Sequence, residues 1–213
     1  MNEKSDSSRL HALFEDLKKK HLVDQNRKLV SDRFVSQFQG IFGKIRYNEQ
    51  FYNSYLVDLD DNVLRFILLH EEGHLKSGTK LPFPAFGAVV ILFLVLVYRY
   101  QIGLFMSIFY LLFLLAVVYR GLFITLYKEE FKVDLFSAEL MKNKFDVKQP
   151  SQLLKQFFRG IDGYRNRTNS KNNSRLILLI FMIVTGLFPD YHPADCSRIL
   201  NIERNIDERA DHL

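Results

Sequence analysis

The chain has 213 residues, 48% of them hydrophobic, which is enough for one ordinary domain or for a domain joined to a membrane anchor. Its 29 Lys and Arg residues exceed its 24 Asp and Glu residues, but they are spread along the sequence without a long basic run. We therefore expect no nucleic-acid partner, because following a phosphate backbone requires clustered positive charge. The single cysteine, Cys196, excludes an internal disulfide and indicates a reducing compartment.

Residues 1–50 are predicted to form an amphipathic helical region. Apolar residues recur there at helical spacing, first Leu10, Leu13, Phe14 and Leu17, then Phe34, Phe38 and Phe42. We expect two helices that pack over a catalytic core. A contact with a membrane surface or with a partner is the alternative role for these helices.

Residues 51–82 are predicted to form a short strand followed by a helix. Residues 52–57 are β-prone, and the acidic run at 58–61 can cap the helix that comes next. That helix should extend from about Asn62 to Lys76, because the following Ser77 and Gly78 are suited to ending it.

Residues 83–127 form a long apolar stretch that contains only two charged residues, Arg99 and Arg120. Residues 100–119 carry no charge and would be about 30 Å long as a helix, which is enough to cross a bilayer. With a turn near Arg99, the stretch predicts a transmembrane helical hairpin. The alternative is a hairpin buried in the core of a soluble protein.

The sequence His70-Glu71-Glu72-Gly73-His74 contains the pattern HExxH. In a helix, histidines at this spacing project from one face, and the glutamate beside the first points to the remaining ligand position of a metal. Val63 and Ile67 fall on the same stripe, so both imidazoles should face the interior of the fold. Two histidines that merely pack in a core would leave Glu71 unexplained.

A catalytic zinc ion requires a third protein ligand. Glu130 and Asp134, which follow the apolar stretch, lie on one face of a helix, so a metal-binding carboxylate and a supporting carboxylate could reach the site together. On spacing alone, Glu129 and Glu130 could equally form a solvated, charged turn at the end of the apolar helix.

Three motifs, in this order, resemble the HtpX and CAAX prenyl protease family of integral-membrane zinc metallopeptidases. They are HEEGH at 70–74, EFKVD at 130–134 and HPADCSRI at 192–199, with the apolar hairpin between the first two. The resemblance covers roughly residues 52–200 and describes a minimal member. It implies a zincin-like catalytic core, mainly α-helical with a small β-sheet, into which the transmembrane hairpin is inserted and whose second half is formed by residues 128–213.

The resemblance also implies roles for individual residues. Glu130 would be the third zinc ligand, and Asp134 would orient one of the histidines. His192 and Arg198 would line the catalytic cleft and contact the substrate or the oxyanion.

A short stretch, Asn53 to Tyr55, resembles the place where relatives offer a strand edge to the substrate. Asn53 and Tyr55 are therefore candidate substrate-binding residues.

His74 and Glu130 must meet at one metal, so the chain between them would cross the bilayer an even number of times. Lys and Arg dominate both flanks of the hairpin, which predicts an integral membrane protein whose site faces the cytoplasm.

The sequence thus predicts a membrane-embedded zinc endopeptidase with one Zn²⁺ per chain, in which Glu71 activates the zinc-bound water. Its expected partners are the lipid bilayer and peptide substrates from membrane-associated or misfolded proteins. One alternative is a non-proteolytic signalling membrane protein with a zinc-binding, peptidase-like fold. The other is a soluble zinc peptidase with a buried hairpin.

Overall fold

The computed structural model describes residues 7–77, 103–171 and 193–208, together with residues 87, 91, 93–95 and 97–99. The chain divides into two compact units. The first, called the core unit below, comprises Met1–Gly78, Glu129–Asn173 and Pro193–Leu213; the second comprises Thr79–Lys128 and Ser174–His192.

The described part of the chain is mainly helical and contains a small mixed sheet. The elements are α1 (Ser7–Lys19), β1 (Lys28–Ser31), β2 (Phe38–Ile41), β3 (Lys44–Tyr47), α2 (Glu49–Phe51), the π-helix η1 (Tyr52–Leu56), α3 (Asp61–Ser77), α5 (Leu104–Phe145), α6 (Pro150–Lys171), α8 (Asp195–Ile202) and the π-helix η2 (Glu203–Asp207).

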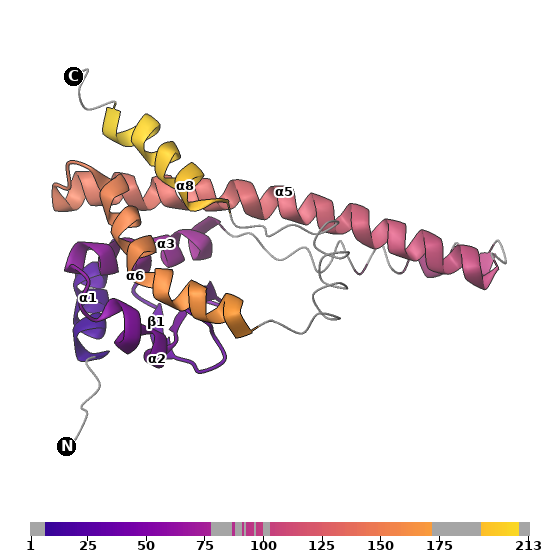
Figure 1. Ribbon diagram of the computed structural model, residues 1–213, viewed down its shortest axis with the longest axis horizontal. Coiled ribbons are helices and arrows are strands. Elements are labelled where there is room, and N and C mark those ends of the chain that lie inside the picture. The colour runs from indigo at the N-terminus through magenta and orange to yellow at the C-terminus, as the bar shows by residue number, and fades with distance from the viewer. Residues whose placement is uncertain are drawn as a thin grey trace. The chain divides into compact units, whose positions relative to one another are not determined.

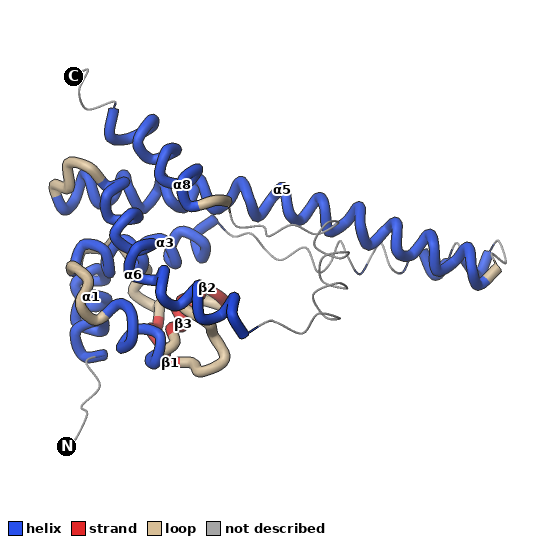
Figure 2. The backbone as a smooth tube through the Cα atoms, viewed as in Figure 1, coloured by secondary structure: helices blue, strands red, loops and turns tan. Residues whose placement is uncertain are grey.

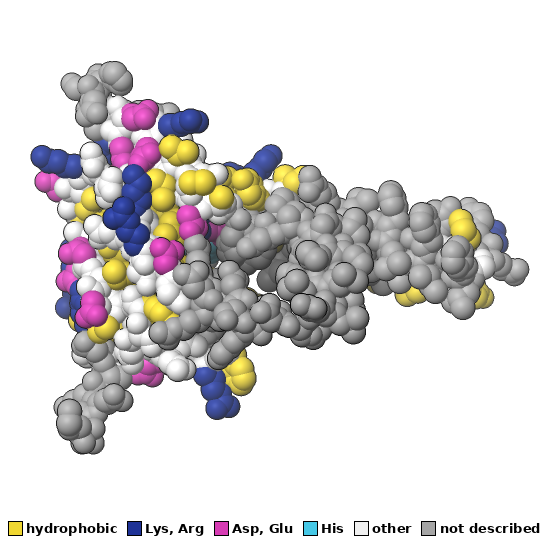
Figure 3. All heavy atoms as spheres, viewed as in Figure 1, with side chains coloured by type: hydrophobic (Ala, Val, Ile, Leu, Met, Phe, Trp, Pro, Cys, Tyr) yellow, Lys and Arg dark blue, Asp and Glu magenta, His cyan; other side chains and the backbone are white. Residues whose placement is uncertain are grey.

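The first helix, α1, buries the apolar face that its sequence spacing predicts. Leu10, Leu13, Phe14 and Leu17 are all buried, which confirms the first of the two expected amphipathic helices. Charged side chains of both signs lie close together on the face of the core unit drawn in Figure 3. This distribution is typical of helices that turn one apolar face inward.

The sheet has the strand order β1-β3-β2, with β1 parallel to β3 and β2 antiparallel to it. Phe42 and Gly43 join β2 to β3, and both have positive φ angles, of 50° and 74°. Two successive residues of this kind give the tight turn whose twist matches that of an antiparallel strand pair. Alternate residues of β3, Ile45 and Tyr47, are buried in the core, so the sheet is amphipathic with a period of two.

Helix α3 lies at the centre of the core unit, between the strands and the C-terminal part of α5 (Figures 1 and 2). Asp60 caps its first turn by accepting a hydrogen bond from Asn62 N at 2.7 Å. Most of its apolar residues are fully buried, among them Leu64, Leu68 and Leu69. The predicted helix at 62–76 is therefore confirmed, with burial on more than one face because it contacts elements on several sides.

Two glycines allow α3 to approach its neighbours closely. A Cβ atom on Gly40 of β2 would collide with the backbone carbonyl oxygen of Glu71, and one on Gly73 would collide with the side chain of Val133 on α5. The absence of side chains at these positions brings both β2 and α5 against the segment that carries the HExxH pattern.

The second predicted amphipathic helix is wrong. Residues 38–41 and 44–47 form strands, and Phe34 and Phe42 are 86% and 80% exposed. Phenylalanines four residues apart also fit one face of a helix, which led to the wrong prediction. The local structure is instead determined by the turn at Gly43 and by the alternation of polar and apolar residues over 44–47.

The strand predicted at 52–57 is also wrong, because these residues continue a helical segment through α2 and η1. Asn48 caps this segment, since its side-chain oxygen accepts a hydrogen bond from Phe51 N at 2.9 Å. Tyr52 and Leu56 are both fully buried at helical spacing. Burial on one helical face therefore outweighs the β-propensity of the run.

The predicted transmembrane hairpin must be corrected. No helix within the described residues combines the length and the apolar character that a membrane crossing requires. This finding contradicts the predicted transmembrane hairpin, on which the assignment as an integral membrane protein with a site facing the cytoplasm rested. Much of the stretch expected to form the first half of the hairpin lies outside the described residues.

Candidate metal centre

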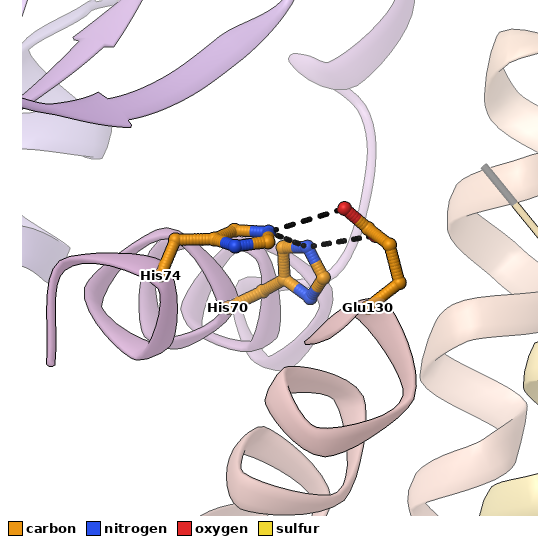
Figure 4. Close-up of side chains that lie close together, drawn as sticks. All are labelled: His70, His74 and Glu130. Carbon is orange, nitrogen blue, oxygen red and sulfur yellow. Dashed lines mark hydrogen bonds and ion pairs between the residues drawn. The ribbon is translucent and has the colours of Figure 1, made fainter. Parts of the chain in front are cut away.

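The two histidines of the HExxH pattern converge from adjacent turns of α3. Their Nε2 atoms lie 3.1 Å apart, with the ring planes almost perpendicular (Figure 4). The side chain of His70 is 12% exposed and that of His74 is 23% exposed. Both rings are thus held in the fold while they retain access to a small ligand.

Glu130 of α5 completes a group of three candidate ligands. One of its carboxylate oxygens, Oε1, lies 3.3 Å from His74 Nε2, and the other, Oε2, lies 3.6 Å from His70 Nε2 (Figure 4). All three residues belong to the core unit. His70, His74 and Glu130 therefore form a group that could hold a metal ion.

The spacing of these atoms can be compared with the geometry that zinc requires. Ligands placed about 2.0–2.2 Å from a tetrahedral zinc ion are about 3.3–3.6 Å from one another. The two Nε2 atoms are 3.1 Å apart, and each lies 3.3 or 3.6 Å from one of the two Glu130 oxygens. Two imidazoles and one carboxylate also match a ligand set of catalytic zinc sites, which leave a further position open. The residues therefore fit zinc.

Asp134 and Arg198 contact two of the candidate ligands, His70 and Glu130, respectively. Arg198 of α8 donates two hydrogen bonds to Asp134, from Nε and Nη2, each 2.7 Å long, although the residues are 64 positions apart. Asp134 Oδ1 lies 3.0 Å from His70 Nδ1, a close ion-pair contact that is not aligned as a hydrogen bond. Arg198 Nη1 also lies 3.3 Å from Glu130 Oε2.

Charge pairing controls the pKa values in this pair. Burial by itself would raise the pKa of Asp134, but the hydrogen bonds from Arg198 and the contact with His70 lower it below its ordinary value. Burial would also lower the pKa of Arg198, which Asp134 and Glu130 raise instead. Both groups are therefore charged in the fold at neutral pH.

Glu71, the expected catalytic base, lies in the same turn as His70. Its Oε2 atom accepts a hydrogen bond of 2.5 Å from Gly40 N of β2, and the residue is 9% exposed. Its charge also raises the pKa of His74. The structure thus holds the carboxylate in a fixed orientation, close enough to the ligand group to act on it electrostatically.

The pKa of His74 has an unusual value. Burial would lower it, but hydrogen bonds and charge interactions with Glu130, Glu71 and Glu129 outweigh burial and raise it from 6.5 to about 9. The proton that His74 binds therefore stabilises the metal-free fold. Its contribution is fully present below about pH 6.5 and is lost as the pH rises through about 9.

We expect this proton to make metal binding depend on pH. A metal ion must displace the proton from His74, so zinc affinity should rise by about tenfold per pH unit between pH 6.5 and pH 9, with release of about one proton. Competition with a zinc chelator of known affinity at several pH values, with an indicator dye for the released proton, measures both quantities. An affinity that is constant over this interval would contradict the expected proton displacement.

Four further residues were predicted for the site: Asn53, Tyr55, His192 and Arg198. Asn53 and Tyr55 lie in η1, which packs against α6, whereas the metal triad lies on α3 and α5. His192 lies outside the described residues. Arg198 pairs with Asp134 and Glu130 and is 9% exposed, and its contact with substrate or oxyanion stays a prediction.

Sequence reasoning missed two contacts of this site. The amide of Gly40 holds Glu71, and Glu129 lies beside His74. Gly40, between Phe38 and Phe42 of the second predicted amphipathic helix, was a signal for the first contact, because glycine is unfavourable inside helices. The pair of adjacent glutamates was the only signal for the second.

Comparisons of this chain with known protein families, with curated proteins and with solved structures gave no match. The core unit is thus defined by its own features, as a helical protein with a small sheet and a candidate centre for one metal ion.

Proposed function

We propose that this chain is a zinc-dependent endopeptidase that resembles the HtpX and CAAX prenyl protease family in its site residues. The observation that carries the proposal is the convergence of two imidazole Nε2 atoms and one carboxylate at distances of 3.1–3.6 Å, with Glu71 in the same turn of α3. A purely structural metal site has no use for a carboxylate base at that position.

When bound, zinc supplies a Lewis acid that lowers the pKa of a water molecule to about 7 and polarises the scissile carbonyl. Glu71 accepts the proton of the attacking water and delivers it to the leaving amine. The amide of Gly40 keeps the Glu71 carboxylate oriented for both transfers. Asp134 and Arg198 hold His70 and Glu130 in place.

The position of β2 supports a proposal for the substrate class. This strand is at the edge of the sheet, and its Gly40 amide is hydrogen-bonded to Glu71. An extended peptide laid along β2 would therefore pass next to the catalytic base. This geometry favours unfolded protein segments as substrates, since a folded protein does not offer an extended backbone.

The test is to measure the zinc content of the purified chain together with its cleavage of unfolded casein. We expect one zinc ion per chain, cleavage that is lost on treatment with a chelator, and recovery when zinc is added back. Zinc binding without cleavage would contradict the peptidase and favour a non-proteolytic protein with a zinc-binding, peptidase-like fold. A chain that binds no zinc would contradict both.

The ligand assignment is tested by Glu130→Ala. This change removes one of three ligands, so the purified variant should lose its zinc and its cleavage of casein together. Glu139→Ala is the matched control, because Glu139 is an exposed carboxylate on the same helix. Full zinc occupancy in Glu130→Ala, measured by elemental analysis, would exclude Glu130 as a ligand.

A further inference from the structure

Glu129 is a buried carboxylate next to the candidate metal ligands. It precedes Glu130 on α5 and is only 6% exposed. Its Oε1 atom lies 3.3 Å from His74 Nδ1, the ring nitrogen on the side away from the metal triad. The hydroxyl of Ser77 donates a short hydrogen bond to the same oxygen. Burying a carboxylate is unfavourable unless it is paired, and these two contacts pair Glu129.

The contacts of α3 and α5 follow one another in reverse order. Glu129 meets Ser77 and His74, Glu130 lies between His74 and His70, and Asp134 meets His70. The two helices therefore pass each other in antiparallel fashion, with the close contact of Gly73 and Val133 between these pairs.

As a result, each histidine has a carboxylate of its own on the Nδ1 side. Asp134 lies 3.0 Å from His70 Nδ1, and Glu129 lies 3.3 Å from His74 Nδ1. A carboxylate at Nδ1 favours the tautomer with the proton on that nitrogen, which leaves the Nε2 lone pair for a metal. Arg198 holds the first carboxylate, and Ser77 at the end of α3 holds the second.

We propose that Glu129, held by Ser77, is a positioning residue that orients His74 as a metal ligand. The inference rests on the metal site of the proposed function but not on the peptidase activity. Ser77 ties Glu129 to α3, because Ser77 is the last residue of that helix and its hydroxyl donates to the carboxylate. The last turn of α3 thus fixes both the histidine and the group that orients it.

The experiment measures zinc affinity, by competition with a chromophoric chelator, for wild type, Glu129→Ala, Glu129→Gln and Ser77→Ala. Glu129→Ala should bind zinc about 10–100-fold more weakly. Glu129→Gln keeps a side-chain oxygen that accepts the same hydrogen bonds, so it should lose less than about tenfold. Ser77→Ala should lose about two- to tenfold. Glu139→Ala, on the exposed side of α5, should match wild type.

The visible absorption of the Co²⁺-loaded proteins gives a second measurement that a purely structural role would not change. We expect the Co²⁺ bands to shift in Glu129→Ala and to return close to the wild-type position in Glu129→Gln. Thermal melting of the metal-free proteins shows which variants are folded. If Glu129→Ala does not fold, the comparison of Glu129→Gln and Ser77→Ala with wild type decides the question, and wild-type affinity in both would overturn the proposal.

Other outcomes separate this proposal from the proposed function. Wild type that binds no zinc would contradict the metal site itself. Wild type that binds zinc while Glu129→Ala binds it equally well, with unchanged Co²⁺ bands, would overturn only the role of Glu129. Equal weakening in Glu129→Gln and Glu129→Ala would also overturn it, because the charge of Glu129 rather than its hydrogen-bonded orientation would then matter.

Discussion

Replacing Glu71 by glutamine is expected to leave the zinc content of the protein unchanged and to reduce its peptidase activity by about a hundredfold or more. Glutamine has nearly the same shape as glutamate, and its side-chain oxygen can still accept the hydrogen bond from Gly40 N. It cannot accept a proton from water, so the variant loses the base alone. The rate of casein cleavage and the zinc content of the same samples provide the measurement.

A suitable control for this change is Glu139→Gln, which removes an exposed carboxylate elsewhere in the chain and should keep full activity. If Glu71→Gln cleaves casein at more than about a tenth of the wild-type rate, Glu71 is not the general base, since a positioned base contributes at least about a hundredfold. Loss of zinc in this variant would instead show that Glu71 is needed to maintain the metal centre.

The largest effect on stability is expected for Asp134→Ala. Asp134 is fully buried and accepts two hydrogen bonds from Arg198, so its removal leaves a buried guanidinium without its main partner. Breaking a buried pair on one side lowers the free energy of unfolding by about 3–5 kcal/mol. Urea unfolding with a chelator present measures this loss without any contribution from bound metal.

Two comparisons make this prediction specific. Arg46 and Asp32 form an ion pair of 3.2 Å that is partly exposed, so Arg46→Ala should lower the free energy of unfolding by about 1 kcal/mol or less. The double variant Asp134→Ala/Arg198→Ala should lose less than the sum of the two single changes, because neither partner is then left unpaired. A loss below about 1 kcal/mol for Asp134→Ala would contradict the stabilising role of the pair.

The stability that the Asp134–Arg198 pair contributes depends on pH. The pKa of Asp134 is lower in the fold than its ordinary value of 3.8. Its contribution to stability is therefore present above about pH 4 and is lost as the pH falls through the pKa of the folded state. It acts in the opposite direction to His74, whose contribution in the metal-free protein is lost as the pH rises through about 9.

The features that the sequence predicted correctly depend on local geometry. The spacing of His70 and His74 on one helical face and the acidic residues that cap α3 involve only neighbouring residues. The apolar face of α1 is also a property of one segment, because residues three and four positions apart meet on the same side of a helix.

The errors arose where one pattern fitted more than one structure. Phe34, Phe38 and Phe42 have helical spacing, but the positive φ angle at Gly43 and the pairing of β2 with β3 produce a hairpin. The β-prone run that begins at Tyr52 became helical because its buried side chains fit the core in that form. The apolar stretch at 83–127 predicted a membrane hairpin from composition, whereas no helix within the described residues has both the length and the apolar character for a crossing.

Only the tertiary structure decided how the candidate centre is assembled. The sequence by itself placed two imidazoles and Glu71 on one helix and suggested Glu130 as their partner. The packing of α3 against α5 brings Glu129 to His74, and α8 supplies Arg198 to Asp134. These contacts join residues far apart in the chain. The contact of Glu129 with His74 accompanies the close approach of α3 and α5 at Gly73, which is a property of packing that local periodicity does not contain.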